Sequence, residues 1–97
     1  MHKLNTKQVQ YLKGKAHKIK PVVSIGNNGL TEGVLAEIEI ALAHHELIKV
    51  KIAGADKETK KLIAETISQK TESYFVQHIG NMIILFKQDE KSKYQLP

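Results

Sequence analysis

The stretch PVVSIGNNGLT, residues 21–31, decides the fold of this chain. Pro21 has no backbone N–H to donate, so a helix that approaches it must end before it. The run over 22–25 is short, rich in β-branched residues and bounded by proline and glycine, which predicts a buried strand. Residues 26–29 are all turn formers, and Thr31 after them is a typical helix N-cap. The stretch therefore predicts a helix end, a strand, a tight loop and a new helix.

Periodicity predicts a helix on each side of this stretch. Upstream, apolar residues recur every three or four positions, which indicates a helix over roughly 6–18 with Thr6 as a candidate N-cap. Downstream, a second helix follows Thr31 and ends near His45. Further along, the sequence predicts a half-exposed strand over 47–53, a third helix from an Asp56 cap to about Lys70, and two strands over 73–79 and 82–86 joined by Gly80-Asn81.

This order of elements predicts an α/β fold of type α-β-α-β-α-β-β with a four-stranded mixed sheet. Helices between strands imply parallel pairing for the first two or three strands, and the hairpin adds one antiparallel neighbour. The last strand is apolar on both faces, so we expect the second and third helices on one face of the sheet and the first helix on or near the other. Residues 1–97 form one domain in this interpretation, with a polar tail that is flexible from about residue 88.

Charge is distributed unevenly along the chain. All 15 basic residues are lysine, and 10 acidic residues leave a net charge of +5. Residues 1–30 carry six lysines and no acid, whereas residues 31–56 carry two lysines and five acids. This polarity favours a polyanionic partner, either nucleic acid or an anionic membrane surface, with a solvated lysine face kept for solubility as the alternative.

The sequence offers little for catalysis, metal binding or membrane insertion. Without cysteine there is no disulfide and no thiolate ligand, and the five histidines form no ligand pair at helical spacing. Glu37 and Glu39 are two positions apart on a helix, so they make no acid–base pair, and Ser24 has no nucleophile-elbow context. The longest apolar run, residues 82–86, is too short to span a bilayer, and the N-terminus has no apolar signal core. We expect a cytoplasmic protein without cofactor, metal, small-molecule substrate or enzymatic activity.

The loop Gly26-Asn27-Asn28-Gly29 is the sharpest local signal. Its glycines permit close approach of a ligand to the backbone, and the N–H groups that open the following helix suit a phosphate oxygen. A plain tight turn is the alternative. Lysines of the first helix and its connection to the strand precede the loop, and a single basic surface that joins them to the loop is feasible. These lysines are Lys7, Lys13, Lys15, Lys18 and Lys20.

Residues 12–31, LKGKAHKIKPVVSIGNNGLT, resemble the opening of the CRM domain, the chloroplast RNA splicing and ribosome maturation module, in its bacterial stand-alone form, the YhbY family. The Ala-His, Lys-Pro and G-x-x-G elements share their order and spacing with that family, and the likeness continues through residues 32–52 and covers almost the whole chain. The resemblance implies an RNA-binding domain with a fold similar to the C-terminal domain of translation initiation factor three. It also implies that residues 26–29 contact RNA, that the lysines of the first helix support them, and that the protein associates with precursors of the large ribosomal subunit.

We therefore predict a monomeric protein that binds structured or helical RNA, ribosomal RNA in these precursors, through phosphates and shape. Sequence readout should be weak, because the chain has no arginine and five aromatic residues that provide no stacking platform of the RRM type. One alternative is a protein-interaction module that docks on a ribosomal or splicing protein through the acidic face of the second helix. Another is a small nucleotide-binding enzyme.

Overall fold

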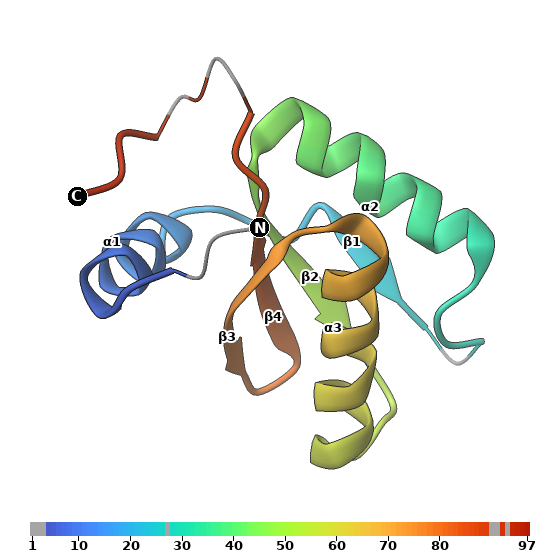
Figure 1. Cartoon of the computed structure of the whole chain (residues 1–97). Helices are drawn as coiled ribbons and strands as arrows, with labels where there is room; N and C mark the ends of the chain where they lie inside the picture. The colour runs from blue at the N-terminus through green and yellow to red at the C-terminus, as the bar shows by residue number, and fades with distance from the viewer. Residues whose placement is uncertain (1–3, 27, 90–91, 93) are drawn as a thin grey trace.

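Three helices and four strands follow one another in the predicted order in the computed structural model, which describes residues 4–26, 28–89, 92 and 94–97 (Figure 1). The elements are α1 (Thr6–Ala16), β1 (Val23–Ile25), α2 (Glu32–His45), β2 (Leu47–Ile52), α3 (Lys57–Thr71), β3 (Tyr74–Ile79) and β4 (Met82–Phe86). The predicted α/β class and the order α-β-α-β-α-β-β are confirmed.

Both ends of α1 differ slightly from the sequence prediction. The N-cap is Asn5, where Thr6 was expected. The Asn5 side chain accepts a hydrogen bond from the Gln8 N–H at 2.8 Å, and the Gln8 side chain accepts one from the Asn5 N–H at 3.0 Å. This reciprocal capping box satisfies the backbone N–H groups of both Asn5 and Gln8. A cap at Thr6 would leave these two N–H groups without those partners. The helix ends at Ala16 because the N–H groups of Lys18 and Ile19 bond to carbonyls three residues back, which tightens the chain before Pro21.

The other two helices begin where the sequence predicts. The Thr31 hydroxyl accepts a hydrogen bond from the Val34 N–H at 3.2 Å and so caps α2. The Asp56 carboxylate accepts one from the Thr59 N–H at 2.7 Å and caps α3. Hydrogen bonds from the Thr59 side chain and backbone hold the pKa of Asp56 below its usual value. Each helix therefore starts with a side chain that satisfies one of its free N–H groups.

The sheet has the strand order β1-β2-β4-β3. β1 and β2 are parallel, with Val23 opposite Val50, and β4 lies antiparallel to both β2 and β3. The predicted hairpin is confirmed, but β3 lies at the edge because β4 is inserted between it and β2. Consecutive side chains of β4, Ile83 and Ile84, are buried on opposite faces of the sheet, so this strand takes a central place with cover on both sides.

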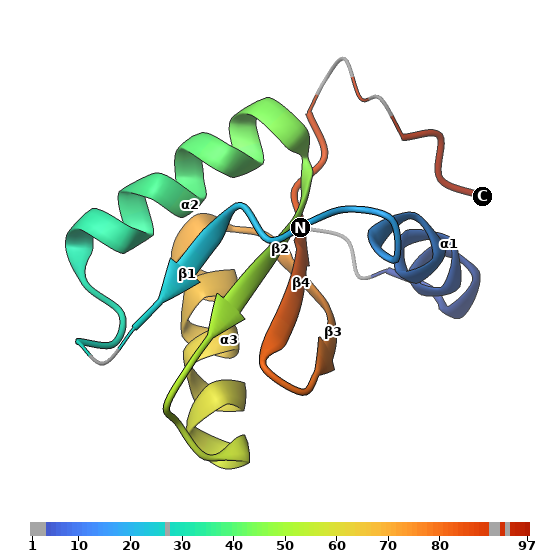
Figure 2. The same cartoon turned by 180° about the vertical axis from the view of Figure 1, so that it is seen from behind.

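Helices cover the sheet on both faces, as predicted (Figures 1 and 2). α2 and α3 bury the larger core, and α1 buries a smaller one against β2, β3 and β4. The fully enclosed members of the smaller core are Leu12, Ala16, Leu47, Val76, Ile84 and Phe86.

The chain after β4 contributes to the smaller core. Tyr94 and Leu96 pack within it, and the Tyr94 ring meets Phe86 edge-on with centroids 5.9 Å apart. The Glu46 carboxylate, on a residue only 3% exposed, accepts a hydrogen bond from the Ser92 hydroxyl at 2.6 Å. Burial, and after it the charge of Glu46, raises the pKa of the Tyr94 hydroxyl. The flexibility of the tail from about residue 88 stays a prediction.

Replacing Tyr94 measures how firmly the tail is held. Tyr94→Ala should lower the free energy of unfolding by about 1 to 2 kcal/mol, because it removes the edge-on aromatic pair with Phe86 and the area that the ring buries. Gln95→Ala, at an exposed neighbouring position, is the control and should change the stability by less than about 0.5 kcal/mol. Urea titration of the two variants gives both values. Equal, negligible effects would indicate a loose tail.

Candidate nucleic-acid interface

The glycine-asparagine loop forms a tight turn at the carboxyl end of β1. The Gly29 N–H donates to the Gly26 carbonyl at 3.0 Å and closes the turn. Gly29 has a φ of +71°, a conformation that other residues adopt only with strain. Asn28 and Gly26 are exposed. Asn27, the remaining predicted site residue of the loop, lies outside the described residues.

The loop faces the start of α3 across a hollow of about 180 Å³. The Ala53 N–H donates to the Ile25 carbonyl at 3.1 Å and ties the base of the loop to the end of β2. A Cβ built on Gly26 meets no atom within 4 Å, and the φ of this residue is not positive. The fold itself therefore does not require glycine at position 26, and a close ligand is one reason to have it there.

Five further predicted site residues lie on α1 and on the connection that follows it. Lys7 and Lys15 are exposed on the helix, whereas Lys13 is half-buried. The Lys15 ammonium lies 5.5 Å from the centre of the Tyr11 ring, a cation–π distance. Lys18 and Lys20, both exposed, precede β1.

The structure does not place the lysines of α1 beside the loop. Figures 1 and 2 show α1 and the loop between β1 and α2 on opposite sides of the molecule, with the sheet between them. β1 runs from the end that Lys20 approaches to the end where Gly26 begins the loop. A joint basic surface therefore needs charged residues on the sheet.

Two lysines of β2 supply that charge. Lys49 and Lys51 alternate with Ile48, Val50 and Ile52, which belong to the core under α2 and α3, so the lysines face the α1 side. Lys49 borders a hollow together with α1, and Lys51 is paired in register with Ser24 of β1, two positions before the loop. We call Lys13, Lys49 and Lys51 the lysine track, because they lead from α1 across the sheet towards the loop.

Sequence reasoning did not include Lys49 or Lys51 among the site residues. Their alternation with apolar residues predicts that they share one face of a strand. It does not tell which helix covers that face, and it does not show that β2 is the neighbour of β1. The missing information was the strand order.

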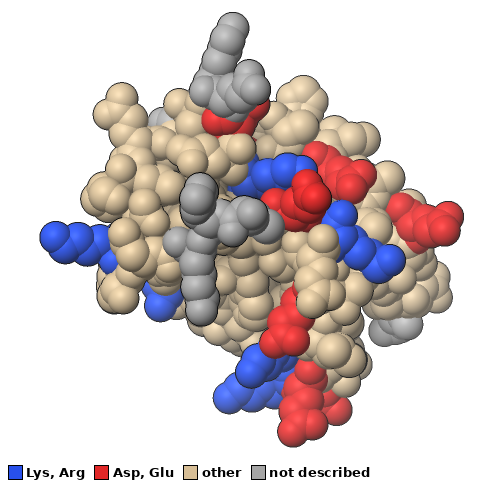
Figure 3. All heavy atoms as spheres, viewed as in Figure 1, with Lys and Arg blue, Asp and Glu red and all other residues tan. Residues whose placement is uncertain are grey.

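Acidic residues are kept away from the lysine track. Neither α1 nor any of the four strands contains an aspartate or a glutamate. The described acids belong to α2, α3, the caps of these helices and the chain after β4: Glu32, Glu37, Glu39, Glu46, Asp56, Glu58, Glu65, Glu72 and Asp89. In Figure 3 the charged side chains on the side where α1 lies are blue, whereas the side of α2 and α3 carries red ones, to which α3 but not α2 adds lysines. The fold therefore separates a mixed face from a basic one.

Two further features, a possible metal site and a membrane-spanning helix, are absent from the described residues. No three histidine or carboxylate side chains within the described ranges come together as a possible metal site. Among the same residues, no helix combines the length and apolar character that crossing a membrane requires.

Comparison with known proteins identifies the family. A model of the CRS1 / YhbY (CRM) domain matches residues 4–87. The chain is 60% identical over 97 residues to an RNA-binding protein of Haemophilus influenzae, covering 100% of this chain and 98% of that one. It is 40% identical over 93 residues to a Pseudomonas aeruginosa protein named as a probable RNA-binding protein, covering 96% and 89% of the two chains.

A solved structure has the same fold. The solution structure of a Staphylococcus aureus protein described as a candidate for RNA binding superposes with a TM-score of 0.86 at 38% identity, covering 98% of this chain and all of that one. The predicted membership is thus confirmed: this chain belongs to the CRS1 / YhbY (CRM) domain family.

Proposed function

We propose that this protein binds structured RNA through the lysine track and the loop at residues 26–29, and that its RNA is ribosomal RNA in precursors of the large subunit. The observation that carries the proposal is that Lys13, Lys49 and Lys51 lead towards the loop over α1 and the strands, elements that contain no aspartate or glutamate. The names of the relatives support RNA as the partner. The ribosomal precursors follow from the family resemblance, and action in the cytoplasm as a monomer without catalysis is part of the proposal made from the sequence.

Phosphates are the natural ligands of the lysine track. Lys49 and Lys51 are two residues apart on one strand, so their Cα atoms lie about 7 Å apart and both side chains extend from the same face. A lysine carries a compact charge on a flexible stem, which attracts phosphate without fixing a planar geometry. Binding of this type follows the backbone and shape of the RNA more than its sequence.

The loop provides a second kind of contact. Because Gly26 has no side chain and faces open space, an RNA backbone can come close to the exposed main chain there. Recognition of nucleotide backbone by a G-x-x-G loop is known in KH modules, although the loop lies between strand and helix here. The lysine track and the loop together would hold RNA along the sheet.

Salt dependence tests the phosphate contacts. If about five lysines neutralise phosphates, the logarithm of the association constant falls with the logarithm of salt concentration with a slope of roughly −3.5 to −4.5. Changing Lys13, Lys49 and Lys51 to glutamine should weaken binding to a duplex RNA and reduce the steepness of this slope by about 2 to 3. Fluorescence anisotropy at four or five salt concentrations measures both quantities.

A matched variant separates the lysine track from overall charge. Changing Lys57, Lys61 and Lys70 of α3 to glutamine removes the same charge from exposed positions on the opposite face. This control variant should retain most of the affinity for duplex RNA and most of the salt dependence of its association constant. Equal losses in the two triple variants would mean attraction to net charge and no localised site.

The loop is tested by one added charge. Asn28→Asp places a carboxylate at an exposed loop position and should lower RNA affinity several-fold, while Gln69→Glu makes the same change on α3 and should have little effect. Gly26→Ala should also weaken binding while the folding stability changes by less than about 0.5 kcal/mol, because the free chain has room for the methyl group. Unchanged affinity in both loop variants would exclude the loop from the interface.

The ribosomal part of the proposal is tested in cell extracts. In a low-salt gradient the protein should sediment with precursors of the large subunit, and several-fold more salt should release it, because screening weakens phosphate contacts. The rival is docking on a protein through α2, whose Glu32, Glu37 and Glu39 are exposed. That rival predicts that the protein stays in its complex after ribonuclease treatment. Such retention, or absence from the precursor fractions, would contradict the proposal.

A further inference from the structure

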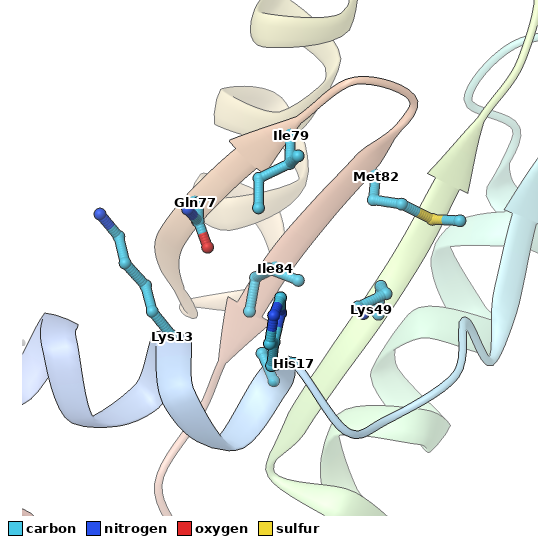
Figure 4. Close-up of a pocket in the computed structure, with 8 residues that line it drawn as sticks. Lys13, His17, Lys49, Gln77, Ile79, Met82 and Ile84 are labelled. Carbon is cyan, nitrogen blue, oxygen red and sulfur yellow. The ribbon is translucent and has the colours of Figure 1, made fainter.

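A hollow of about 290 Å³ lies on the sheet beside the end of α1 (Figure 4). Four elements line it: Lys13, Ala16 and His17 come from α1 and its end, Lys49 from β2, Gln77 and Ile79 from β3, and Met82 and Ile84 from β4. The hollow is separate from the loop at residues 26–29, and it borders the lysine track through Lys13 and Lys49.

Its lining has an apolar floor and a polar rim. Ile84 and Ala16 are each 2% exposed and form the buried part, while Ile79 and Met82 extend the apolar surface towards solvent. The rim carries two lysines, a histidine and the Gln77 amide, and no carboxylate. This combination suits a flat, largely apolar ring with polar edges that is attached to negative charge.

A bulge in β3 turns the side chains of Gln77 and Ile79 towards the face of the sheet that α1 covers. The register between β3 and β4 shifts between Phe75 and Gln77, so the regular alternation is interrupted there. Val76 belongs to the core under α1, and the next residue, Gln77, lines the hollow on that same face. Two residues later Ile79 follows on this face and stays 53% exposed. The irregular strand thus exposes an amide and an isoleucine beside the lysines.

We propose that the hollow receives the base of an unpaired nucleotide of the bound RNA. This inference rests on the proposed function and adds a preference for a bulged or looped nucleotide within structured RNA. The base packs on Ile79, Met82 and Ile84, and its polar edge meets Gln77, while the flanking phosphates lie against Lys13 and Lys49. A base is a suitable occupant because the hollow is open and near the lower end, roughly 300 Å³, of the range for small-ligand sites.

The charge pattern distinguishes this occupant from a protein segment. An apolar peptide needs no cations around its binding site. A hollow with lysine on two sides and no acid among its described lining residues favours a ligand that brings its own negative charge. A duplex alone does not fill the hollow, because its bases are stacked and their faces are covered. An unpaired nucleotide offers both the free face and the phosphates.

The test compares two stem RNAs that differ by one unpaired nucleotide, a fluorescent 2-aminopurine, in the middle of the stem. The unaltered protein should bind the bulged RNA about five-fold more tightly than the fully paired RNA, the lower range of what one stacked base contributes. The ratio of the two affinities should change little with salt, since the additional contact is apolar. The fluorescence of the unpaired base should change on binding.

Two charge-neutral variants complete the design. Ile79→Ser should remove the preference for the bulged RNA and leave the affinity and salt slope for the paired RNA unchanged. Ile40→Ser, the same replacement at a 60% exposed position on α2, is the control and should keep the preference. Gln77→Ala provides a second variant of the hollow should Ile79→Ser fail to fold.

The possible results separate the two proposals. The base site is overturned if the unaltered protein binds both RNAs equally, or if the preference for the bulged RNA survives both Ile79→Ser and Gln77→Ala. In either case, salt-dependent binding of the paired RNA still supports the proposed function. Such a result would leave the hollow to a protein ligand. Absence of salt-dependent binding to either RNA would overturn the proposed function itself.

Discussion

The two-sided burial of β4 is the constraint on which the rest of the structure depends. Its side chains alternate between two apolar cores, so the strand is stable only where both faces of the sheet are covered. Placing it between β2 and β3 provides that cover and sends β3 to the edge. The burial of Ile83, Ile84, Leu85 and Phe86 removes most of their apolar surface from water, which stabilises the fold by roughly 1.5 to 3 kcal/mol for each side chain.

Cover on the second face is incomplete because α1 packs on one end of the sheet. Its buried residues Leu12 and Ala16 share a core with Leu47, Ile84 and Phe86, so α1 shields the end where Leu47 pairs with Phe86. On the remaining part of that face, the strands carry side chains that contact solvent. Lys49 and Lys51 of β2 point to this face and the apolar residues between them to the other, and the bulged β3 places Gln77 and Ile79 there. The exposed basic surface is therefore a direct consequence of where the core ends.

Charge separation gives this surface its chemical character. α2 carries three glutamates and no lysine, and α3 carries two glutamates and four lysines, whereas among Asp, Glu, Lys and Arg the strands and α1 carry lysine alone. A polyanion is therefore attracted to the face formed by α1 and the strands, and it encounters charges of both signs on the face formed by α2 and α3. The loop stands at the end of that basic face, where Lys51 is paired with Ser24. Two contact types, charged side chains and bare backbone, thus lie along one path.

The sequence by itself determined the elements, their order and the layer arrangement. The sequence signals for these features are local: the caps Thr31 and Asp56, the helix end before Pro21, and the apolar residues on both faces of 82–86. Steric restriction and hydrogen bonds within a few residues are enough to fix where such elements begin and end. The sequence prediction placed the cap of the first helix at Thr6, one residue late, because Asn5 and Thr6 both carry a side-chain oxygen that can accept a hydrogen bond. The reciprocal bonds with Gln8 make Asn5 the cap.

Only the tertiary structure decided which residues make up one surface. The helix lysines and the loop are close along the chain, which made a single basic surface feasible from the sequence, whereas the fold puts the sheet between them. Lys49 and Lys51 join the two regions because β2 pairs with β1, and Gln77 faces the hollow because of a bulge. Strand order and bulges arise from long-range pairing that minimises exposed apolar area, and periodicity in a single segment carries no information about the partner strand.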